Sequence, residues 1–225
     1  MSDAASFVRA VEERLPSLVD PAYREQIERL VPGVRAKGVR VPRLRALTKE
    51  LVTEHGLELD AQCEAMDALS RTGGREEILI GAMALSRPPK RVLQLEWTRI
   101  EGWLAAVDNW ETCDLIALSL AAPLVTAQPE LVERLRVLAT RERVWERRFA
   151  VATSAALNQK GRTNVDATLS ICALVVGDRE PMVRKAIAWA LREASERDAD
   201  AVRGFLAEHG GALGRGLVRE ASKKL

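Results

Sequence analysis

Cysteine, histidine and tyrosine are scarce in this chain of 225 residues, which holds three, two and one of them. The cysteines, Cys63, Cys113 and Cys172, show no short spacing, and His55 and His209 lie far apart. These positions therefore assemble neither a zinc motif nor a disulfide framework. We expect three buried thiols in a reducing compartment, and we expect no metal ion or other cofactor.

Long apolar runs are also lacking. No stretch approaches the roughly 20 apolar residues that a membrane-spanning helix needs. The segment 1–16 carries acidic side chains and no long apolar core, so it does not resemble a signal peptide. We expect a cytoplasmic protein.

The charged residues nearly balance, with a net charge of +2, but their distribution is uneven. Residues 1–140 hold 18 basic and 21 acidic side chains, net −3, whereas residues 141–225 hold 16 and 11, net +5. This basic excess favours a polyanionic partner for the C-terminal third, although it is modest for a dedicated nucleic-acid-binding domain.

Sustained alternation of apolar and polar residues is absent, and apolar residues recur instead every three or four positions, which predicts an all-α protein. Connections of two to six residues predict a single domain over residues 1–225. Pro32 and Gly33 are expected to close the second helix. The predicted helices cover residues 7–15, 23–31, 42–52, 59–69, 75–86, 93–107, 110–122, 130–139, 142–157, 165–176, 180–196, 199–209 and a last stretch from 214 to 225.

From residue 110 onward the predicted helices fall into pairs, over residues 110–140, 142–177 and 180–209. Tryptophans in the first helices of the three pairs are 35 and 44 residues apart, close to the unit length of HEAT and armadillo repeats. Stacked helical pairs form a curved solenoid, and equivalent helices line its concave face. We therefore predict a curved solenoid of HEAT-like repeats.

The third of these tryptophans lies on a helix with two distinct stripes. Lys185, Trp189 and Arg192 share one stripe, because residues three or four apart lie on one helical face. The other stripe is wholly apolar and is enough to bury the helix. Packing therefore does not explain why Trp189 and the two cations occupy the other stripe. The apolar stripe consists of Val183, Ile187, Leu191 and Ala194.

The same pairing of a tryptophan with a charge occurs twice more, as Trp110 with Asp114 and as Trp145 with Arg148. An isolated pair of this kind is often a half-buried ring under a cation. Three pairs on first helices of successive repeats are expected to point into one groove, where the cations suit phosphate groups. Asp114 would repel phosphate, so it either pairs with an arginine or stabilises positive charge that develops during a reaction.

Five stretches of the sequence form a pattern: the segments 110–114, 144–148, 185–193 and 219–225, together with Gly38-Val39-Arg40-Val41-Pro42-Arg43-Leu44-Arg45 near the N-terminus. In order and separation they resemble the signature stretches of the AlkD family of bacterial DNA glycosylases. The segment 185–193, Lys-Ala-Ile-Ala-Trp-Ala-Leu-Arg-Glu, is the most specific of them.

This resemblance implies HEAT-like repeats and excision of cationic purines, alkylated at N3 or N7, from duplex DNA by a monomeric enzyme. It implies that Asp114 is the catalytic carboxylate and that Trp110 and Trp189 flank the deoxyribose of the lesion. Arg148 would hold the DNA backbone. By position, further phosphate contacts are expected from Lys185, Arg192 and Lys160.

Two positions differ from the family pattern. Some relatives have an aromatic residue just before the Gly38 motif, where this chain has none, and Tyr23 lies further upstream. Asn109 stands where some relatives have a second tryptophan. Two other functions remain open: a non-catalytic protein that binds damaged or branched DNA, and a solenoid that binds other proteins.

Overall fold

The computed structural model describes residues 2–31 and 33–225, whose regular secondary structure is helical throughout, with no strand among them. The predicted all-α fold class is confirmed. The chain forms two compact units, Met1–Leu120 and Ala121–Leu225, and each is described by itself. The prediction that the chain is a single domain stays a prediction.

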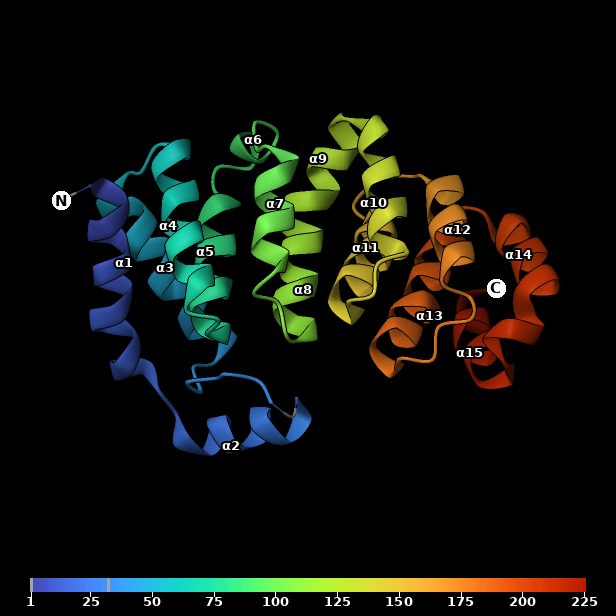
Figure 1. Ribbon diagram of the computed structural model, residues 1–225, viewed down its shortest axis with the longest axis horizontal. Helices are drawn as coiled ribbons and strands as arrows, with labels where there is room; N and C mark the ends of the chain where they lie inside the picture. Colours follow the sequence, from blue (N-terminus) through green and yellow to red (C-terminus); the bar gives the residue numbers. More distant parts are fainter. Residues whose placement is uncertain (1, 32) are drawn as a thin grey trace. The chain divides into compact units, whose positions relative to one another are not determined.

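The first unit stacks most of its helices in two layers (Figure 1). In one layer α5 packs between α3 and α8, and in the other α4 packs against α1 and α7. Contacts between α4 and α5 join the two layers. The elements are α1 (Asp3–Arg14), η1 (Leu15–Leu18), α2 (Pro21–Leu30), α3 (Val41–His55), α4 (Leu59–Arg71), α5 (Arg75–Leu85), α6 (Pro89–Val92), α7 (Trp97–Leu104) and α8 (Trp110–Ile116).

The second unit also has two layers. Helices α11, α13 and α15 pack side by side in one, and α10, α12 and α14 do so in the other. The pairs predicted for residues 142–177 and 180–209 are α11 with α12 and α13 with α14. The elements are α9 (Ala122–Ala127), η3 (Pro129–Leu131), α10 (Val132–Ala139), α11 (Val144–Ala156), α12 (Val165–Leu174), α13 (Pro181–Ser195), α14 (Ala199–Leu213), α15 (Arg215–Ala221) and η4 (Ser222–Lys224).

The helix that starts at Trp110 is longer than its sequence suggests. It was expected to end near Pro123, but a π-helical turn, Ala117–Ala121, joins α8 to α9, which continues to Ala127. Pro123 falls in the first turn of α9, directly after the π-helical turn. The run Trp110–Ala127 thereby becomes 18 residues long and apolar enough to cross a membrane by length and composition. Half of it is buried within the protein, as in a core helix.

Two other boundaries differ from those predicted. The helix expected from residue 93 begins only at Trp97, after the short α6. The second helix ends at Leu30; Pro32, which was expected to help close it, lies outside the described residues. Both differences affect loops and leave the stacked helices unchanged.

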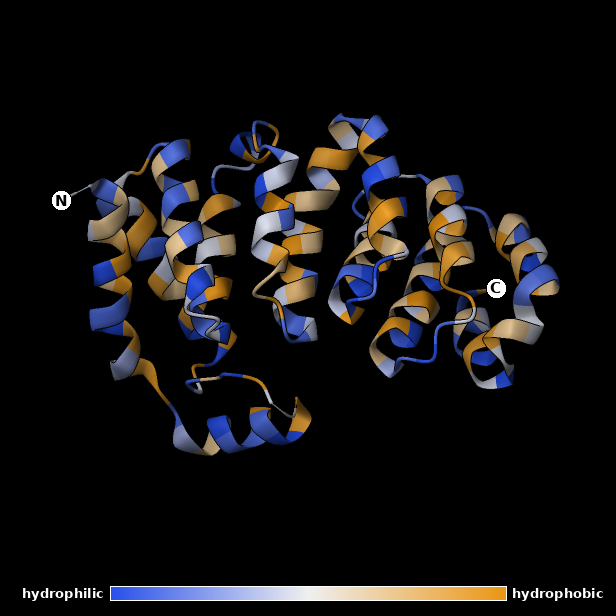
Figure 2. Ribbon diagram, in the orientation of Figure 1, coloured by the Kyte–Doolittle hydropathy of each residue, from blue (hydrophilic) through white to orange (hydrophobic). Residues whose placement is uncertain are grey.

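The apolar stripes of the helices form the cores. In the first unit, Phe7, Val11, Leu44, Leu51 and Leu69 are among the side chains that are almost fully buried. Figure 2 shows that many helices carry hydrophobic residues on one side and hydrophilic residues on the other. Helix α5 is the exception, because all its residues are buried.

Polar residues at the start of α5 hold the chain that precedes α3. The Glu76 carboxylate, which has no exposed surface, accepts hydrogen bonds from the backbone N–H groups of Lys37 (2.9 Å), Gly38 (3.0 Å) and Val39 (3.1 Å). Gly38 has φ +93°, and a Cβ there would lie 2.6 Å from the Cβ of Arg24. The Gly38 motif thus has a structural explanation: only glycine fits between Glu76 and the start of α2.

Replacing Glu76 by alanine is expected to lower the free energy of unfolding by about 3–5 kcal/mol, because Arg75 loses one of its two carboxylate partners and three backbone donors lose their acceptor. Urea denaturation measures this. Glu50→Ala, on the exposed side of α3, is the control and should change stability by less than about 0.5 kcal/mol. Equal stabilities of the two variants would contradict the role given to Glu76.

All three thiols are buried, as predicted. Burial raises the pKa of Cys63 to about 11 and that of Cys172 to about 12, so both stay protonated at neutral pH. Because the thiolate is the reactive form, the native protein should not react with iodoacetamide at pH 8, whereas the urea-unfolded chain should take up three labels. Rapid labelling of the native protein, followed by mass spectrometry, would contradict this.

Candidate functional site

Helix α8 presents the predicted catalytic pair in the first unit. Trp110 is its first residue and remains 38% exposed, and Asp114 lies one turn further on, partly buried. A spacing of four residues puts both side chains on one helical face. The π-helical turn begins three residues after Asp114, and such turns occur often at functional sites. The structure therefore leaves a ring and a carboxylate side by side and accessible.

Asn109 fixes where α8 begins. Its side-chain oxygen accepts hydrogen bonds from the N–H groups of Glu111 (3.1 Å) and Thr112 (3.0 Å), and its amide donates to Asp108 (2.9 Å). The residue is almost fully buried. Asn109 is therefore the N-cap of α8 and holds its first turn in place. Some relatives have a tryptophan at this position.

Arg75 ties this first turn to the rest of the first unit. Its fully buried guanidinium group forms ion pairs with Glu111 (2.6 Å) and Glu76 (2.9 Å). It also donates hydrogen bonds to the carbonyl of Val39 (3.2 Å) and to the hydroxyl of Tyr23 (3.4 Å). Burial acts to lower the pKa of Arg75, but the hydrogen bond and charge of Glu111 together with the charge of Glu76 raise it overall. One side chain thus links α2, the Gly38 motif, α5 and α8.

Tyr23 is the aromatic residue that this network brings toward α8. The guanidinium group of Arg40 lies over its ring, 4.6 Å from the centroid. Asp20 holds Arg40 at 3.1 Å, and the backbone N–H of Tyr23 together with Arg40 lowers the pKa of Asp20. Tyr23 is distant from Glu111 in sequence, but both contact the Arg75 side chain. Some relatives have an aromatic residue directly before the Gly38 motif, where this chain has none. Tyr23 is the candidate to take its place.

In the second unit, Arg148 is buried against the neighbouring helix. Its Nη1 donates a hydrogen bond of 2.6 Å to the carbonyl of Met182 at the start of α13, and only 6% of the residue is exposed. Arg147 pairs with Asp178 at 2.6 Å. The guanidinium groups of α11 therefore help to fasten α11 to α13, and Arg148 offers little surface to a ligand.

Helix α13 divides as its sequence predicts. Val183, Ile187 and the rest of the apolar stripe are fully buried. Lys185 is exposed, and Trp189 and Arg192 are partly exposed. Arg192 donates a long hydrogen bond, 3.4 Å, to a backbone carbonyl of α15. The stripe of one ring and two cations is therefore accessible, in agreement with the prediction.

Trp145 and Trp189 occupy different positions in their helices. Trp145 is the second residue of α11, and Trp189 is the ninth residue of α13. Trp189 lies one helical turn from Lys185 and from Arg192.

Lys160 lies in the turn that follows α11. It is exposed and adopts a left-handed conformation with φ +52°. The preceding Asn158 carbonyl accepts a hydrogen bond of 2.9 Å from Arg197, which fixes the turn against the end of α13. The position suits contact with a ligand at this edge of the second unit.

The structure thus brings Trp110 next to Asp114 in one unit, and Lys185, Trp189 and Arg192 together in the other. The prediction that both groups line one groove stays a prediction. Among residues 2–31 and 33–225, no cluster of three or more histidine, cysteine or acidic side chains could hold a metal ion.

Two comparisons with known proteins give matches. Residues 11–225 match the family model of the DNA alkylation repair enzymes. The chain belongs to this family. A solved structure of a protein from Enterococcus faecalis, described as a predicted DNA alkylation repair enzyme, superposes with a TM-score of 0.75. It is 21% identical, and the match covers 92% of this chain and 96% of that one. No curated protein matches.

Family membership supports a role for this DNA alkylation repair protein in the repair of alkylated DNA, with DNA as its partner. The Enterococcus structure, at its level of identity, shows that the fold is shared. The predicted architecture of stacked helical pairs is confirmed on this basis.

Sequence reasoning missed Arg75, Glu76 and Glu111, which position the candidate site. For Arg75 and Glu76 the sequence holds a signal. Together with Glu77 they directly precede the apolar run 78–85, and these charged residues are buried with that run. Charges that are buried must be paired. Such a cluster in an otherwise apolar helix therefore indicates a polar network.

Arg148→Ala is expected to reduce the free energy of unfolding by about 1–3 kcal/mol, because the Met182 carbonyl loses a charged donor in a buried position. The exposed Lys185→Ala is the control and should change stability by less than about 0.5 kcal/mol. Urea denaturation of both variants measures the difference. Wild-type stability of Arg148→Ala would show that Arg148 has no structural role.

Proposed function

We propose that this protein is a monofunctional DNA glycosylase of base-excision repair, which hydrolyses the N-glycosidic bond of purines alkylated at N3 or N7 in duplex DNA. The observation that carries this proposal is the accessible pair of Trp110 and Asp114 on one face of α8, held by a buried ion-pair network. The enzyme would act as a monomer in the bacterial cytoplasm, at the nucleoid during repair.

The reaction suits a carboxylate without a general acid. A purine alkylated at N3 or N7 is already cationic, so it leaves as a neutral base when the electron pair of the glycosidic bond moves to its nitrogen. Positive charge then develops at C1′ of the sugar, as an oxocarbenium-like species. An anion beside C1′ stabilises this charge, because preorganised charge lowers the energy of the transition state.

Asp114 would provide that anion and would also take a proton from the water that adds to C1′. Trp110 and Trp189 would place the faces of their rings around the deoxyribose, where their π systems attract developing positive charge. Tyr23, held over Arg75, is a third aromatic side chain available to the duplex. These assignments need no metal ion at the reacting atoms.

The basic residues of the second unit would hold the DNA backbone. Lys185 and Arg192 flank Trp189 and would contact phosphates beside the lesion, and Lys160 would do so from the turn after α11. The backbone contact expected of Arg148 stays a prediction, because this residue is buried and bonded to the Met182 carbonyl. Phosphate contacts position the duplex and carry no information about the lesion.

The alternative is a non-catalytic protein that binds damaged or branched DNA. The two functions need the same cations and rings, but only a glycosylase needs an anion beside C1′, which is the role proposed for Asp114. A test of Asp114 therefore separates them.

Release of 7-methylguanine and 3-methyladenine from methylated duplex DNA, measured in single turnover, tests the proposal. Asp114→Asn should reduce the rate about 10²–10³-fold, the usual cost of removing one preorganised electrostatic group. Asp166→Asn, an exposed carboxylate in the first turn of α12, is the matched control and should act at the wild-type rate.

Both rates should be compared at equal fractions of bound DNA, so that a change in affinity does not hide a change in chemistry. Full activity of Asp114→Asn would refute the catalytic role of this residue. Tight DNA binding by the wild type without any base release would favour the non-catalytic alternative.

A further inference from the structure

The first unit contains a basic stretch that the charge balance of the whole chain conceals. Between Glu28 and Glu50 there is no acidic residue, although the overall charge of residues 1–140 is negative. Seven cations occupy this stretch: Arg29, Arg35, Lys37, Arg40, Arg43, Arg45 and Lys49. A run of one sign on a folded helix is a candidate surface for a polyanion.

Four of these seven cations have acidic partners within the first unit. Arg29 pairs with Glu25, Arg35 with Asp108, Lys37 with Glu77 and Arg40 with Asp20. In the described part of the chain, the remaining three, Arg43, Arg45 and Lys49, have no ion pair, and their residues are exposed. All three belong to α3.

The packing of α3 separates these three cations. Arg43 and Glu50 line a pocket of about 300 Å³ with Arg14 and Leu18, and Glu54 pairs with Arg14 at 2.7 Å. This flank of α3 therefore faces the end of α1. With 3.6 residues per turn, Arg45 is turned by about 200° from Arg43 and lies on the opposite flank.

The flank of α3 that carries Arg45 lies on the side of the candidate site. Helix α3 packs against α1 and α5, and α5 packs against α8. Arg45 and Lys49, one turn apart, therefore lie on the α5 side, in the same layer as Trp110. The acidic residues of α5 do not project between them and α8, because Glu76 and Glu77 are buried.

We infer that Arg45 and Lys49 of α3 bind phosphates of duplex DNA flanking the lesion. This inference rests on the proposed function, which makes duplex DNA the substrate. The two cations are about 6 Å apart along the helix axis, at 1.5 Å per residue. Duplex DNA carries one negative charge per roughly 1.7 Å of its axis, so several phosphates lie within their reach.

Like charges four residues apart on a helix destabilise it by about 0.2–0.5 kcal/mol. The pair therefore adds nothing to the stability of α3, whose buried face, Leu44, Leu47 and Leu51, already holds it in place. A bound polyanion removes the repulsion and releases its own counterions, which favours binding. Charge complementarity with DNA thus accounts for an arrangement that packing does not explain.

The experiment compares the salt dependence of binding to an undamaged duplex for the wild type and for Arg45→Gln/Lys49→Gln. Each lost phosphate contact reduces the slope of log K against log salt by about 0.9, so the double variant should lose about 1.8. Between 50 and 200 mM salt, the affinity of the wild type should then fall about tenfold further than that of the variant.

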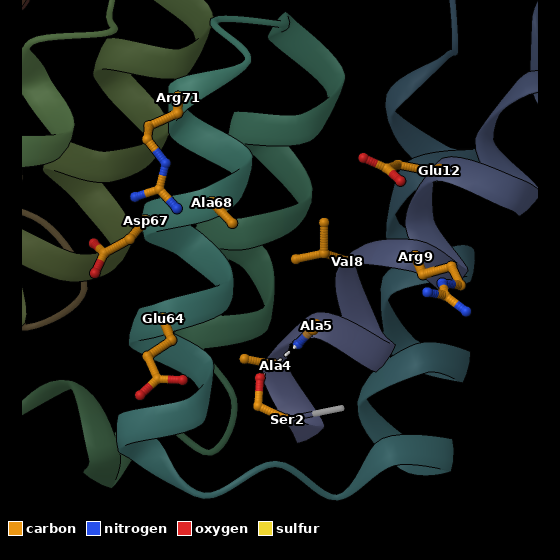
Figure 3. A pocket seen from close by; sticks show the side chains of 10 residues that line it. All are labelled: Ser2, Ala4, Ala5, Val8, Arg9, Glu12, Glu64, Asp67, Ala68 and Arg71. Carbon is orange, nitrogen blue, oxygen red and sulfur yellow. Dashed lines mark hydrogen bonds between the residues drawn. The ribbon is translucent and has the colours of Figure 1, made fainter.

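A matched control is available on another surface of the first unit. Arg9 and Arg71 are exposed cations on the rim of a groove of about 550 Å³ between α1 and α4, where Val8 and Ala68 lie across from one another (Figure 3). Arg9→Gln/Arg71→Gln removes the same two charges outside the layer of α3, α5 and α8. It should keep the wild-type slope.

The outcomes separate this inference from the proposed function. A wild-type slope for Arg45→Gln/Lys49→Gln, or an equal loss in the control, would overturn the inference, whether or not the enzyme releases bases. A wild type that does not bind duplex DNA would overturn it as well. A reduced slope together with no base release by the wild type would support the α3 surface and reject the glycosylase.

Discussion

The buried guanidinium group of Arg75 is the interaction on which the first unit depends. An ion taken out of water costs several kcal/mol unless it is paired, and Arg75 is paired with Glu76 and Glu111. Because Glu76 also holds three backbone N–H groups of the Gly38 motif, one charge network sets the start of α3 and of α8 together. Removing Glu76 would leave Arg75 with Glu111 as its one carboxylate partner and would deprive the three backbone N–H groups of their acceptor.

This network explains how the candidate catalytic pair is held. Trp110 and Asp114 lie on a helix whose first turn is fixed twice, by the Asn109 cap and by the ion pair of Glu111. Functional side chains on rigid elements keep their geometry better than those on loops. Trp110 and Asp114 can therefore contact a ligand, while the buried residues Asn109 and Arg75 keep the helix in place.

The second unit shows the same division among its cations. Arg147 pairs with Asp178 in the loop before α13, and Arg184 donates a hydrogen bond to the carbonyl of Leu213 at the end of α14. Arg148 bonds to α13, whereas Lys185 stays exposed. In sequence, all of these are basic residues at helical spacing. The position of the neighbouring helix end decides which of them hold helices together and which stay accessible to a ligand.

The sequence by itself determined the all-α class, the pairs of α11 with α12 and α13 with α14, and the two stripes of α13, because periodicity is a local property. It failed at Pro123, where a π-helical turn that proline rules do not anticipate continues the helix. Only the tertiary structure decided that Tyr23 reaches the α8 network and that Arg148 is buried. Both depend on side chains from segments distant in the chain, whose meeting no local pattern records.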